Sequence, residues 1–269
     1  MGRGGVRLWY WTQTVASAAG TCLVVHGLGE HSGRYHHVAE ALNRHRWNVW
    51  ALDYRGHGRS EGRRGHCGSL HELLDDVGTV ITHLKAQPAA TPLVLLGHSL
   101  GGLIVLTYAL ECPNDLHAVV ASSPALDLAT PPPWLKRWVA EVLGPRWPTL
   151  AVHNGVHPAW LSHDPASVAA YRRDPLIHDR VTLGGYLAVR EAMRWALTHA
   201  GQMRAPCLIL QAGDDRIVSA AASRRFAEAV GSPGSQYREY PGWFHELFNE
   251  VGREDAVGDL THWLAARHN

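Results

Sequence analysis

The sequence predicts an α/β fold in which helices flank a mainly parallel central sheet and a mostly helical cap is inserted into the chain. Strand-sized apolar runs bounded by Gly, Pro or Asp alternate with helix-sized amphipathic stretches, a pattern typical of βαβ units. From about residue 127 to 198 the alternation stops, and afterwards a strand-like run resumes. We therefore expect one core domain, residues 1–126 and 199–269, with residues 127–198 as the inserted cap or lid.

The expected strands are short apolar runs, each ending at a residue that favours a turn. They are Thr21–His26, Trp47–Asp53, Leu93–Gly97, Leu116–Ala121, Cys207–Gln211 and a last strand at Tyr237–Tyr240.

Three helices of the core domain are expected between and after these strands. One follows Ser69 and ends before Pro88, with Ser69 as N-cap and Glu72 three residues later, the spacing of a capping box. Leu100–Glu111 is apolar almost all round, which predicts a helix buried against the sheet. Asp255–Arg267 is expected to be the closing helix.

Composition excludes several classes of protein. Lys and Arg number 25 against 24 Asp and Glu, so no basic field favours nucleic acid, and we expect no nucleic-acid partner. No stretch has the roughly 18 apolar residues of a membrane span, and the first twenty residues lack the apolar core of a signal peptide. These features favour a soluble cytoplasmic protein. The oligomeric state is left open.

The four cysteines, Cys22, Cys67, Cys112 and Cys207, are far apart and form no CxxC unit, which argues against a structural zinc or a redox site. Cys22 and Cys207 lie in apolar runs and are expected to be buried in strands as reduced thiols. The 19 histidines show no spacing typical of zinc ligands apart from the adjacent His36 and His37. We expect no metal and no other cofactor.

The motif that points most directly to chemistry is Gly97-His98-Ser99-Leu100-Gly101, between an expected strand and an expected buried helix. In a GxSxG turn at such a junction the glycines relieve backbone crowding, and the serine hydroxyl is exposed at a helix N-terminus, where developing negative charge is favoured. The motif alone arises by chance in a chain of this length, but its position makes Ser99 the predicted nucleophile.

A serine hydroxyl needs a base, and the base needs a partner that orients it. With this kind of turn the order along the chain is serine, acid, histidine. Asp214 and Asp215 follow the strand at residues 207–211, and His245 follows the last strand in a loop. We therefore predict His245 as the base, although a histidine on a surface loop is the alternative for one of so many.

An oxyanion hole needs backbone N–H donors, so the side chains there matter little. His26-Gly27-Leu28-Gly29 follows an apolar strand, which makes the Leu28 N–H the candidate first donor and the Leu100 N–H the second. Without Ser99 this segment would be an ordinary glycine-rich turn.

Long strings of this sequence resemble the monoacylglycerol lipase and lysophospholipase branch of the α/β-hydrolase superfamily of serine hydrolases, over nearly the whole chain. They are HGLGEHSGRY at 26–35, DYRGHGRSEG at 53–62, GHSLGG at 97–102, the stretch 161–176, and Asp215-Arg216-Ile217-Val218. In the family pattern the acid directly precedes such an Arg-Ile-Val stretch, which favours Asp215 over Asp214.

The resemblance implies a triad of Ser99, Asp215 and His245 that hydrolyses carboxylic esters with a lipophilic acyl group. It also implies that the cap shapes an acyl tunnel. Leu28 and Leu100 differ from the residues often found at these two positions in the family. Both contribute backbone to the oxyanion hole, so the difference bears on the shape of the acyl pocket.

Three alternatives remain at this point. An acyltransferase or an amidase would use the same triad, because nucleophiles other than water can take the acyl group. A non-catalytic binding protein on the hydrolase scaffold would not need intact triad residues. Dehalogenases and epoxide hydrolases resemble this fold but carry Asp at the position of Ser99.

The predicted cap contains Trp134–Leu143, a helix for which Pro133 is the expected first residue. Its apolar residues form one stripe, namely Trp134, Leu135, Trp138, Val139, Val142 and Leu143. We expect this stripe to line or cover the acyl entrance, although packing on the core is an equal alternative. Transient contact of the cap with a membrane surface is also left open, as is the acyl-chain length.

Overall fold

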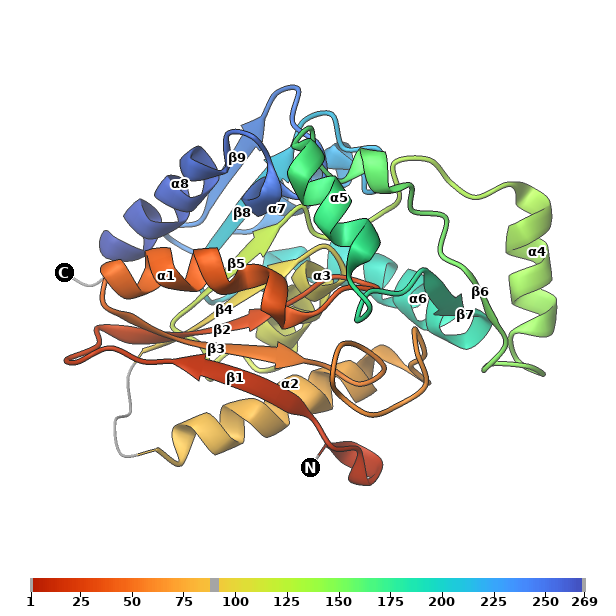
Figure 1. Cartoon of the computed structure of the whole chain (residues 1–269), viewed down its shortest axis with the longest axis horizontal. Helices are drawn as coiled ribbons and strands as arrows, with labels where there is room; N and C mark the ends of the chain where they lie inside the picture. Colours follow the sequence, from red (N-terminus) through yellow and green to blue (C-terminus); the bar gives the residue numbers. More distant parts are fainter. Residues whose placement is uncertain (1, 88–91, 268–269) are drawn as a thin grey trace.

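A seven-stranded sheet forms the centre of the computed structural model, which describes residues 2–87 and 92–267 (Figure 1). In spatial order the strands are β1 (Trp9–Gln13), β3 (Trp47–Asp53), β2 (Gly20–Val25), β4 (Leu93–His98), β5 (Ala118–Ser122), β8 (Cys207–Ala212) and β9 (Gln236–Tyr240). Neighbouring strands are parallel except β1, which pairs antiparallel with β3 at one edge. The predicted mainly parallel sheet is confirmed, and every predicted strand is present with its bounds shifted by two residues at most.

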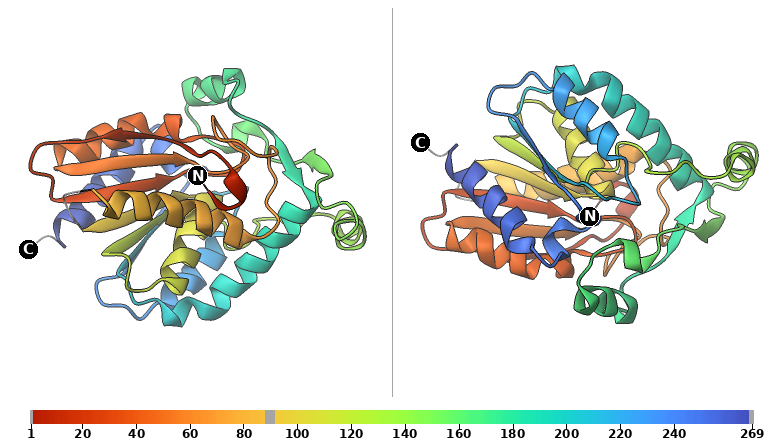
Figure 2. Two further views of the ribbon diagram at one scale, coloured as in Figure 1. Left: turned by 90° about the horizontal axis from the view of Figure 1, so that it is seen from below. Right: turned by 90° about the horizontal axis from the view of Figure 1, so that it is seen from above.

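Helices cover both faces of the sheet (Figure 2). One face is covered by α1 (His36–Arg44) and α8 (Arg253–Ala265), the other by α2 (Leu70–Lys85), α3 (Leu100–Glu111) and α7 (Ala220–Ala229). The helix predicted at 100–111 is confirmed, and every residue of α3 except Glu111 is buried. The closing helix begins and ends two residues earlier than predicted.

Strand β2 shows why these strands read as continuous apolar runs. Leu23 and Val25 pack into the core on the α3 side, whereas Cys22 and Val24 pack into the core on the α8 side. Successive side chains of a strand point to opposite faces, and here both faces are covered by helices. Cys22 and Cys207 are buried in β2 and β8, as predicted, and burial raises the pKa of each thiol to about 12.

The start of α2 differs from the prediction. Ser69 precedes the helix, but among the described residues its side chain caps no backbone N–H, so the capping box is not formed. Instead, the Glu72 carboxylate accepts a hydrogen bond of 2.8 Å from the Gly68 N–H. The helix ends at Lys85, and Pro88, expected to limit it, lies outside the described residues.

The chain between β5 and β8 leaves the sheet and returns to it. It contains α4 (Trp134–Leu143), β6 (Ala151–His153), α5 (Pro165–Arg173), β7 (Arg180–Thr182) and α6 (Leu183–His199), and β6 and β7 pair antiparallel. Helix α6 buries Ala192, Met193 and Ala196 in the core beside α3, whereas α4 stands apart from the sheet (Figure 1). Pro133 has an extended backbone and is the N-cap of α4, so the expectation that it is the first helical residue is wrong.

Short 3₁₀ helices complete the secondary structure: η1 (Arg3–Gly5), η2 (Ser32–Tyr35), η3 (Pro158–Trp160), η4 (Ala200–Gln202) and η5 (Leu247–Asn249). Across the two described ranges, no helix combines the length and the apolar character needed to cross a membrane.

A buried ion pair anchors the long loop after β3. Asp76, fully buried on α2, accepts hydrogen bonds from the Arg55 backbone N–H at 3.0 Å and from two of its guanidinium nitrogens at 2.8 and 2.6 Å. A charged group inside a protein is tolerated only when its hydrogen-bonding atoms are paired in this way. The pair therefore holds the 53–62 segment against α2.

We expect Asp76→Ala to lower the free energy of unfolding by about 3–5 kcal/mol, because the buried Arg55 then loses the three hydrogen bonds that its backbone N–H and guanidinium make to this carboxylate. Lys85→Ala is the control: it removes an ion pair of 2.6 Å with Asp115 on the exposed surface and should cost about 0–1 kcal/mol. Urea unfolding measures both. Equal losses would show that burial does not strengthen the Arg55 pair.

Candidate active site

Ser99 lies in a sharp turn between β4 and α3, with a left-handed φ of 53° and a ψ of −117°. A residue with a side chain is strained in this conformation and keeps it only where the surrounding structure enforces it. The Ser99 N–H donates to the Ser122 carbonyl at 2.9 Å, and the Ser99 carbonyl accepts from Leu103 at 3.1 Å. These bonds hold the turn between β5 and the first turn of α3.

The two flanking glycines are required by space. A Cβ on Gly97 would overlap the Gly101 carbonyl, and a Cβ on Gly101 would overlap the carbonyl oxygens of Val25 and His26. The helix thus begins in close contact with the end of β2. This contact brings Ser99 beside the segment that carries Leu28.

Asp215 and His245 form a buried pair at the carboxyl ends of β8 and β9. His245 Nδ1 lies 2.7 Å from Asp215 Oδ2, and the other carboxylate oxygen accepts from the Ile217 and Val218 N–H groups at 2.8 and 2.9 Å. Asp214 is exposed and makes no contact with His245 among the hydrogen bonds of the described chain. The structure therefore brings Asp215, and not Asp214, against His245.

The pairing of Asp215 with His245 shifts the pKa of both side chains. Burial alone would lower the pKa of His245, but the Asp215 carboxylate outweighs it and raises that pKa above its ordinary value. Burial alone would raise the pKa of Asp215, but the imidazolium and the hydrogen bonds lower it. The carboxylate stays ionised and favours a proton on His245. These are the properties of an acid that orients and strengthens a base.

Leu28 and Leu100 present backbone amides to the same cavity. Within the described parts of the chain, neither N–H donates to a protein acceptor, and both residues line the cavity that Ser99 and His245 also line. Two free amides beside a nucleophile are the donors that a tetrahedral oxyanion requires.

Sequence reasoning assigned no role to the charged network behind this site. Glu30 accepts from the Gly27 N–H at 2.6 Å, from the Tyr35 hydroxyl at 2.8 Å and from Arg34 at 2.7 Å. Arg34 also forms a two-bond pair of 2.5 and 2.6 Å with Glu246. Burial would raise the pKa of Glu30, but Arg34 and the other neighbours outweigh it and bring it to about 2. The signals in the sequence were the spacing of four residues between Glu30 and Arg34 and their place in the HGLGEHSGRY string at 26–35.

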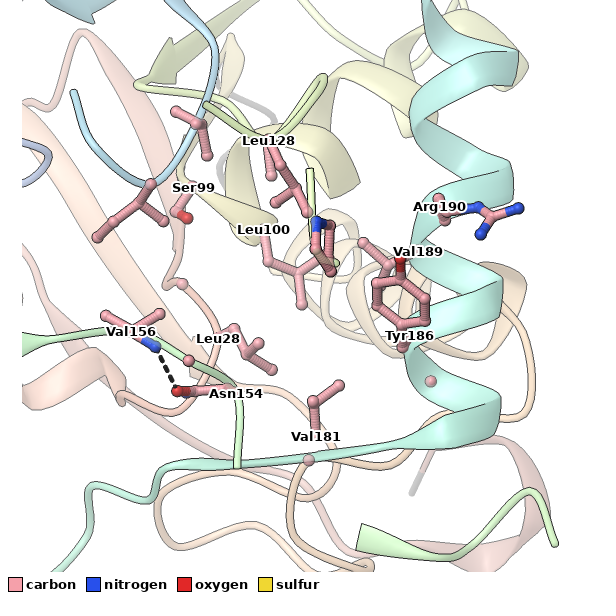
Figure 3. A pocket seen from close by; sticks show the side chains of 18 of the residues that line it. Leu28, Ser99, Leu100, Leu128, Asn154, Val156, Val181, Tyr186, Val189 and Arg190 are labelled. Carbon is pink, nitrogen blue, oxygen red and sulfur yellow. Dashed lines mark hydrogen bonds between the residues drawn. The ribbon is translucent and has the colours of Figure 1, made fainter. Parts of the chain in front are cut away.

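The cavity in front of Ser99 has a volume of about 560 Å³, within the range of small-molecule sites. Figure 3 shows Ser99 on one side of it and the α6 residues Tyr186, Val189 and Arg190 across from it. Apolar side chains make up much of the wall, including Leu28, Leu100 and Leu128 nearer to Ser99 and Val181 nearer to Tyr186.

The apolar stripe of α4 does not line this cavity as we expected. Its inner face contributes Lys136 and Ala140 to the wall. Trp134, Leu135 and Trp138 instead point outward, with 76%, 53% and 54% of their surface exposed. The exposed part of the stripe neither packs on the core nor lines the cavity, whereas Val139 and Leu143 of the same stripe are half-buried.

No group of three His, Cys, Asp or Glu side chains that could hold a metal ion occurs in residues 2–87 and 92–267.

Comparison with known proteins places this architecture in one family. The Hydrolase_4 family model, described as serine aminopeptidase, S33, matches residues 16–252. The monoacylglycerol lipase of Mycolicibacterium smegmatis is 35% identical over 268 residues, covering 98% of this chain and 95% of that protein. The monoglyceride lipase of Homo sapiens is 30% identical over 265 residues, covering 96% and 86%.

A solved structure agrees with these relatives. The crystal structure of the Paleococcus ferrophilus monoacylglycerol lipase matches with a TM-score of 0.89 at 36% identity, covering 97% of this chain and 99% of that one. The predicted α/β-hydrolase fold and the family resemblance are confirmed. The chain therefore belongs to the monoacylglycerol lipase branch of the α/β hydrolases, and it is a carboxylic-ester hydrolase of the monoglyceride lipase and lysophospholipase type.

Proposed function

We propose that this enzyme hydrolyses monoacylglycerol-like esters, or other esters with one lipophilic acyl chain, through an acyl-enzyme on Ser99. The observation that carries the proposal is the strained Ser99 turn at an apolar cavity that is also lined by His245, which pairs with the buried Asp215. The relatives named monoacylglycerol lipase support the choice of substrate.

In the proposed reaction Ser99 Oγ attacks the ester carbonyl while His245 Nε2 takes the hydroxyl proton. The charge that develops on the carbonyl oxygen is stabilised by the Leu28 and Leu100 N–H groups. His245 then gives its proton to the leaving alcohol, and the acyl group remains on Ser99. Water attacks this ester, His245 accepts its proton and returns it to Ser99 Oγ, and the carboxylic acid leaves.

The network around Arg34 argues against an aminopeptidase as the second candidate. A free substrate amine would need an acidic partner, and Glu30 and Glu246 are the only carboxylates among the described residues that line the cavity. Both are already paired with Arg34. Transfer of the acyl group to an added alcohol would use the same groups, and product analysis with the alcohol present separates transfer from hydrolysis.

For residues 127–198 we propose the role of a cap over the acyl cavity, with α4 as its outermost part. The exposed face of α4 suits a lipid surface, because an apolar patch beside the exposed Arg137 can insert into an interface and attract anionic headgroups. This contact would bring the enzyme to esters held in membranes or micelles. The cytoplasmic location expected from the sequence stays a prediction.

Ser99→Ala should abolish ester hydrolysis, on the order of a 10⁶-fold loss of turnover, because no other group in the proposed mechanism can form the acyl-enzyme. Turnover of p-nitrophenyl esters and labelling by a fluorophosphonate probe measure the loss, and circular dichroism checks that the fold is intact. Activity within about tenfold of wild type would rule out Ser99 as the nucleophile.

Asp215→Asn should reduce turnover on the order of 10⁴-fold, while Asp214→Asn, a change on the exposed neighbour, should alter it little. Because Asp215 raises the pKa of His245, the neutral base should be lost below a pH that lies above the ordinary histidine value. Removing the carboxylate should move this acid limb to lower pH. Profiles of kcat/KM against pH test both points, and the opposite ranking of the variants would assign the acid to Asp214.

Replacing both Trp134 and Trp138 by Ala should lower the rate on long-chain monoacylglycerols in micelles several-fold. The rate on soluble acetate esters should stay near wild type, because these side chains point away from the cavity. The two substrates are compared in one preparation. An equal loss on both would show that the tryptophans support the fold.

A further inference from the structure

Residues 160–178, here called the bracket, contact both loops that carry the proposed catalytic groups. The bracket runs from Trp160 through α5 to His178. One end lies against the loop of His245, and the other lies against the loop of Leu28. Trp160, Leu161 and Tyr171 also line the cavity, so the bracket is at once a wall of the site and a link between its two halves.

At the first end, main-chain hydrogen bonds reach the base itself. The Glu246 N–H donates to the Leu161 carbonyl at 2.8 Å, and the His245 N–H donates to the Trp160 carbonyl at 3.4 Å. The base is thus held from two sides, by Asp215 on the core and by the cavity wall on the bracket.

A single buried carboxylate completes this end. Glu250 Oε1 accepts from the Phe244 N–H at 3.0 Å and pairs with His163 Nδ1 at 2.6 Å. Its other oxygen accepts from the His163 N–H at 3.0 Å and the Ser162 hydroxyl at 3.2 Å. Burial would raise the pKa of Glu250, but these hydrogen bonds lower it, so the group is an anion. It joins residues 162–163 of the bracket to the residue that precedes His245.

Ring contacts around Phe244 also connect the bracket with the loop of His245. His163 stacks on Phe244 with ring centroids 3.7 Å apart, and the Arg216 guanidinium lies over the Phe244 ring at 4.5 Å. Arg216 is the residue after Asp215. The contacts around Phe244 therefore connect the bracket with the loops of both His245 and Asp215.

At the second end the bracket holds the loop of Leu28. The His178 N–H donates to the Gly29 carbonyl at 2.8 Å, and His31 Nε2 lies 2.9 Å from Asp174 Oδ2. Gly29 has a left-handed φ of 80°, and a Cβ there would overlap the His178 carbonyl. The position of the Leu28 amide thus depends on this close approach.

We propose that the bracket sets the position of the base relative to the oxyanion donors, and that Glu250 is the positioning residue that fastens it to the loop of His245. The inference rests on the proposed roles of Ser99, His245 and Leu28. Reacting groups displaced by about 1 Å can lose about 100-fold in rate. Trp160 and Leu161 line the cavity and bond the loop of His245. A shift of these wall residues would therefore move the base and change the turnover rate.

Glu250→Gln tests the first fastening, because the amide keeps the shape and the size but turns an NH₂ group toward N–H donors. We expect kcat on a soluble ester to fall about 10- to 100-fold, with KM changed less than about twofold. The downfield ¹H NMR signal of the His245 Nδ1–H, identified by its absence in Asp215→Asn, should shift or broaden. Glu254→Gln, on an exposed side chain of the same segment, is the control and should match wild type.

Asp174→Asn tests the second fastening. It weakens the bond to His31 and should lower kcat about tenfold, less than the 10²- to 10³-fold of losing an oxyanion donor. The His245 signal should stay at its wild-type position, since this end does not reach the base. Asp179→Asn, in an exposed pair with His153, is the matched control.

If the Glu250→Gln variant does not fold, His163→Phe tests the positioning role of Glu250 instead. It keeps a ring on Phe244 but removes the bond to Glu250, at a side chain that is 47% exposed, and should shift the His245 signal and lower kcat. Wild-type kcat with an unshifted signal in a folded variant would overturn the positioning role. A wild-type protein without esterase activity would instead refute the proposed function, and the NMR comparison would still test the position of His245.

Discussion

The backbone turn at Ser99 is the constraint on which the rest of the site depends. A serine with a positive φ between β4 and α3 is tolerated only because Gly97 and Gly101 let α3 begin against the end of β2. That close approach places the Leu100 amide, the Leu28 loop and the hydroxyl around one point. The strain is offset by α3, which is buried along almost its whole length and packs on a sheet with no freedom to relax.

Around this turn, buried carboxylates hold the loops by accepting hydrogen bonds from their backbone N–H groups. Glu30 accepts from the Gly27 N–H, Asp53 from Ser32 and Arg59, Asp215 from Ile217 and Val218, and Glu250 from Phe244 and His163. Loops at the carboxyl edge of a parallel sheet have many unpaired N–H groups, and an anion that collects several of them satisfies them at once. The buried carboxylates of this protein thus fix the backbone conformation of the loops around the site.

The sequence predicted helices and strands wherever a periodic pattern of apolar residues defines them. It did not predict contacts between residues that are far apart in the chain. Strand β3 and helix α3 have their predicted bounds because each apolar pattern is strong. Strand β1 was missed: it is a half-buried edge strand whose aromatic run of three residues is short and is followed by the polar Thr12 and Gln13. Ser69 was expected to cap α2, but Glu72 took the free N–H of Gly68. Glu250 was missed because its partners in the bracket, Ser162 and His163, lie more than eighty residues away.

The apolar stripe of α4 is a second case in which the sequence predicted the element but not its contacts. Periodicity predicted the helix and its apolar face, but it could not tell which way the face turns, because the α4 face with Lys136 and Ala140 lines a cavity formed by distant parts of the chain. The inner half of the insertion, by contrast, bonds directly to the loops of His245 and Gly29. Under our proposals the outer helix is free to vary with the surface that the enzyme meets, whereas changes between Trp160 and His178 would alter the position of the base relative to the oxyanion donors.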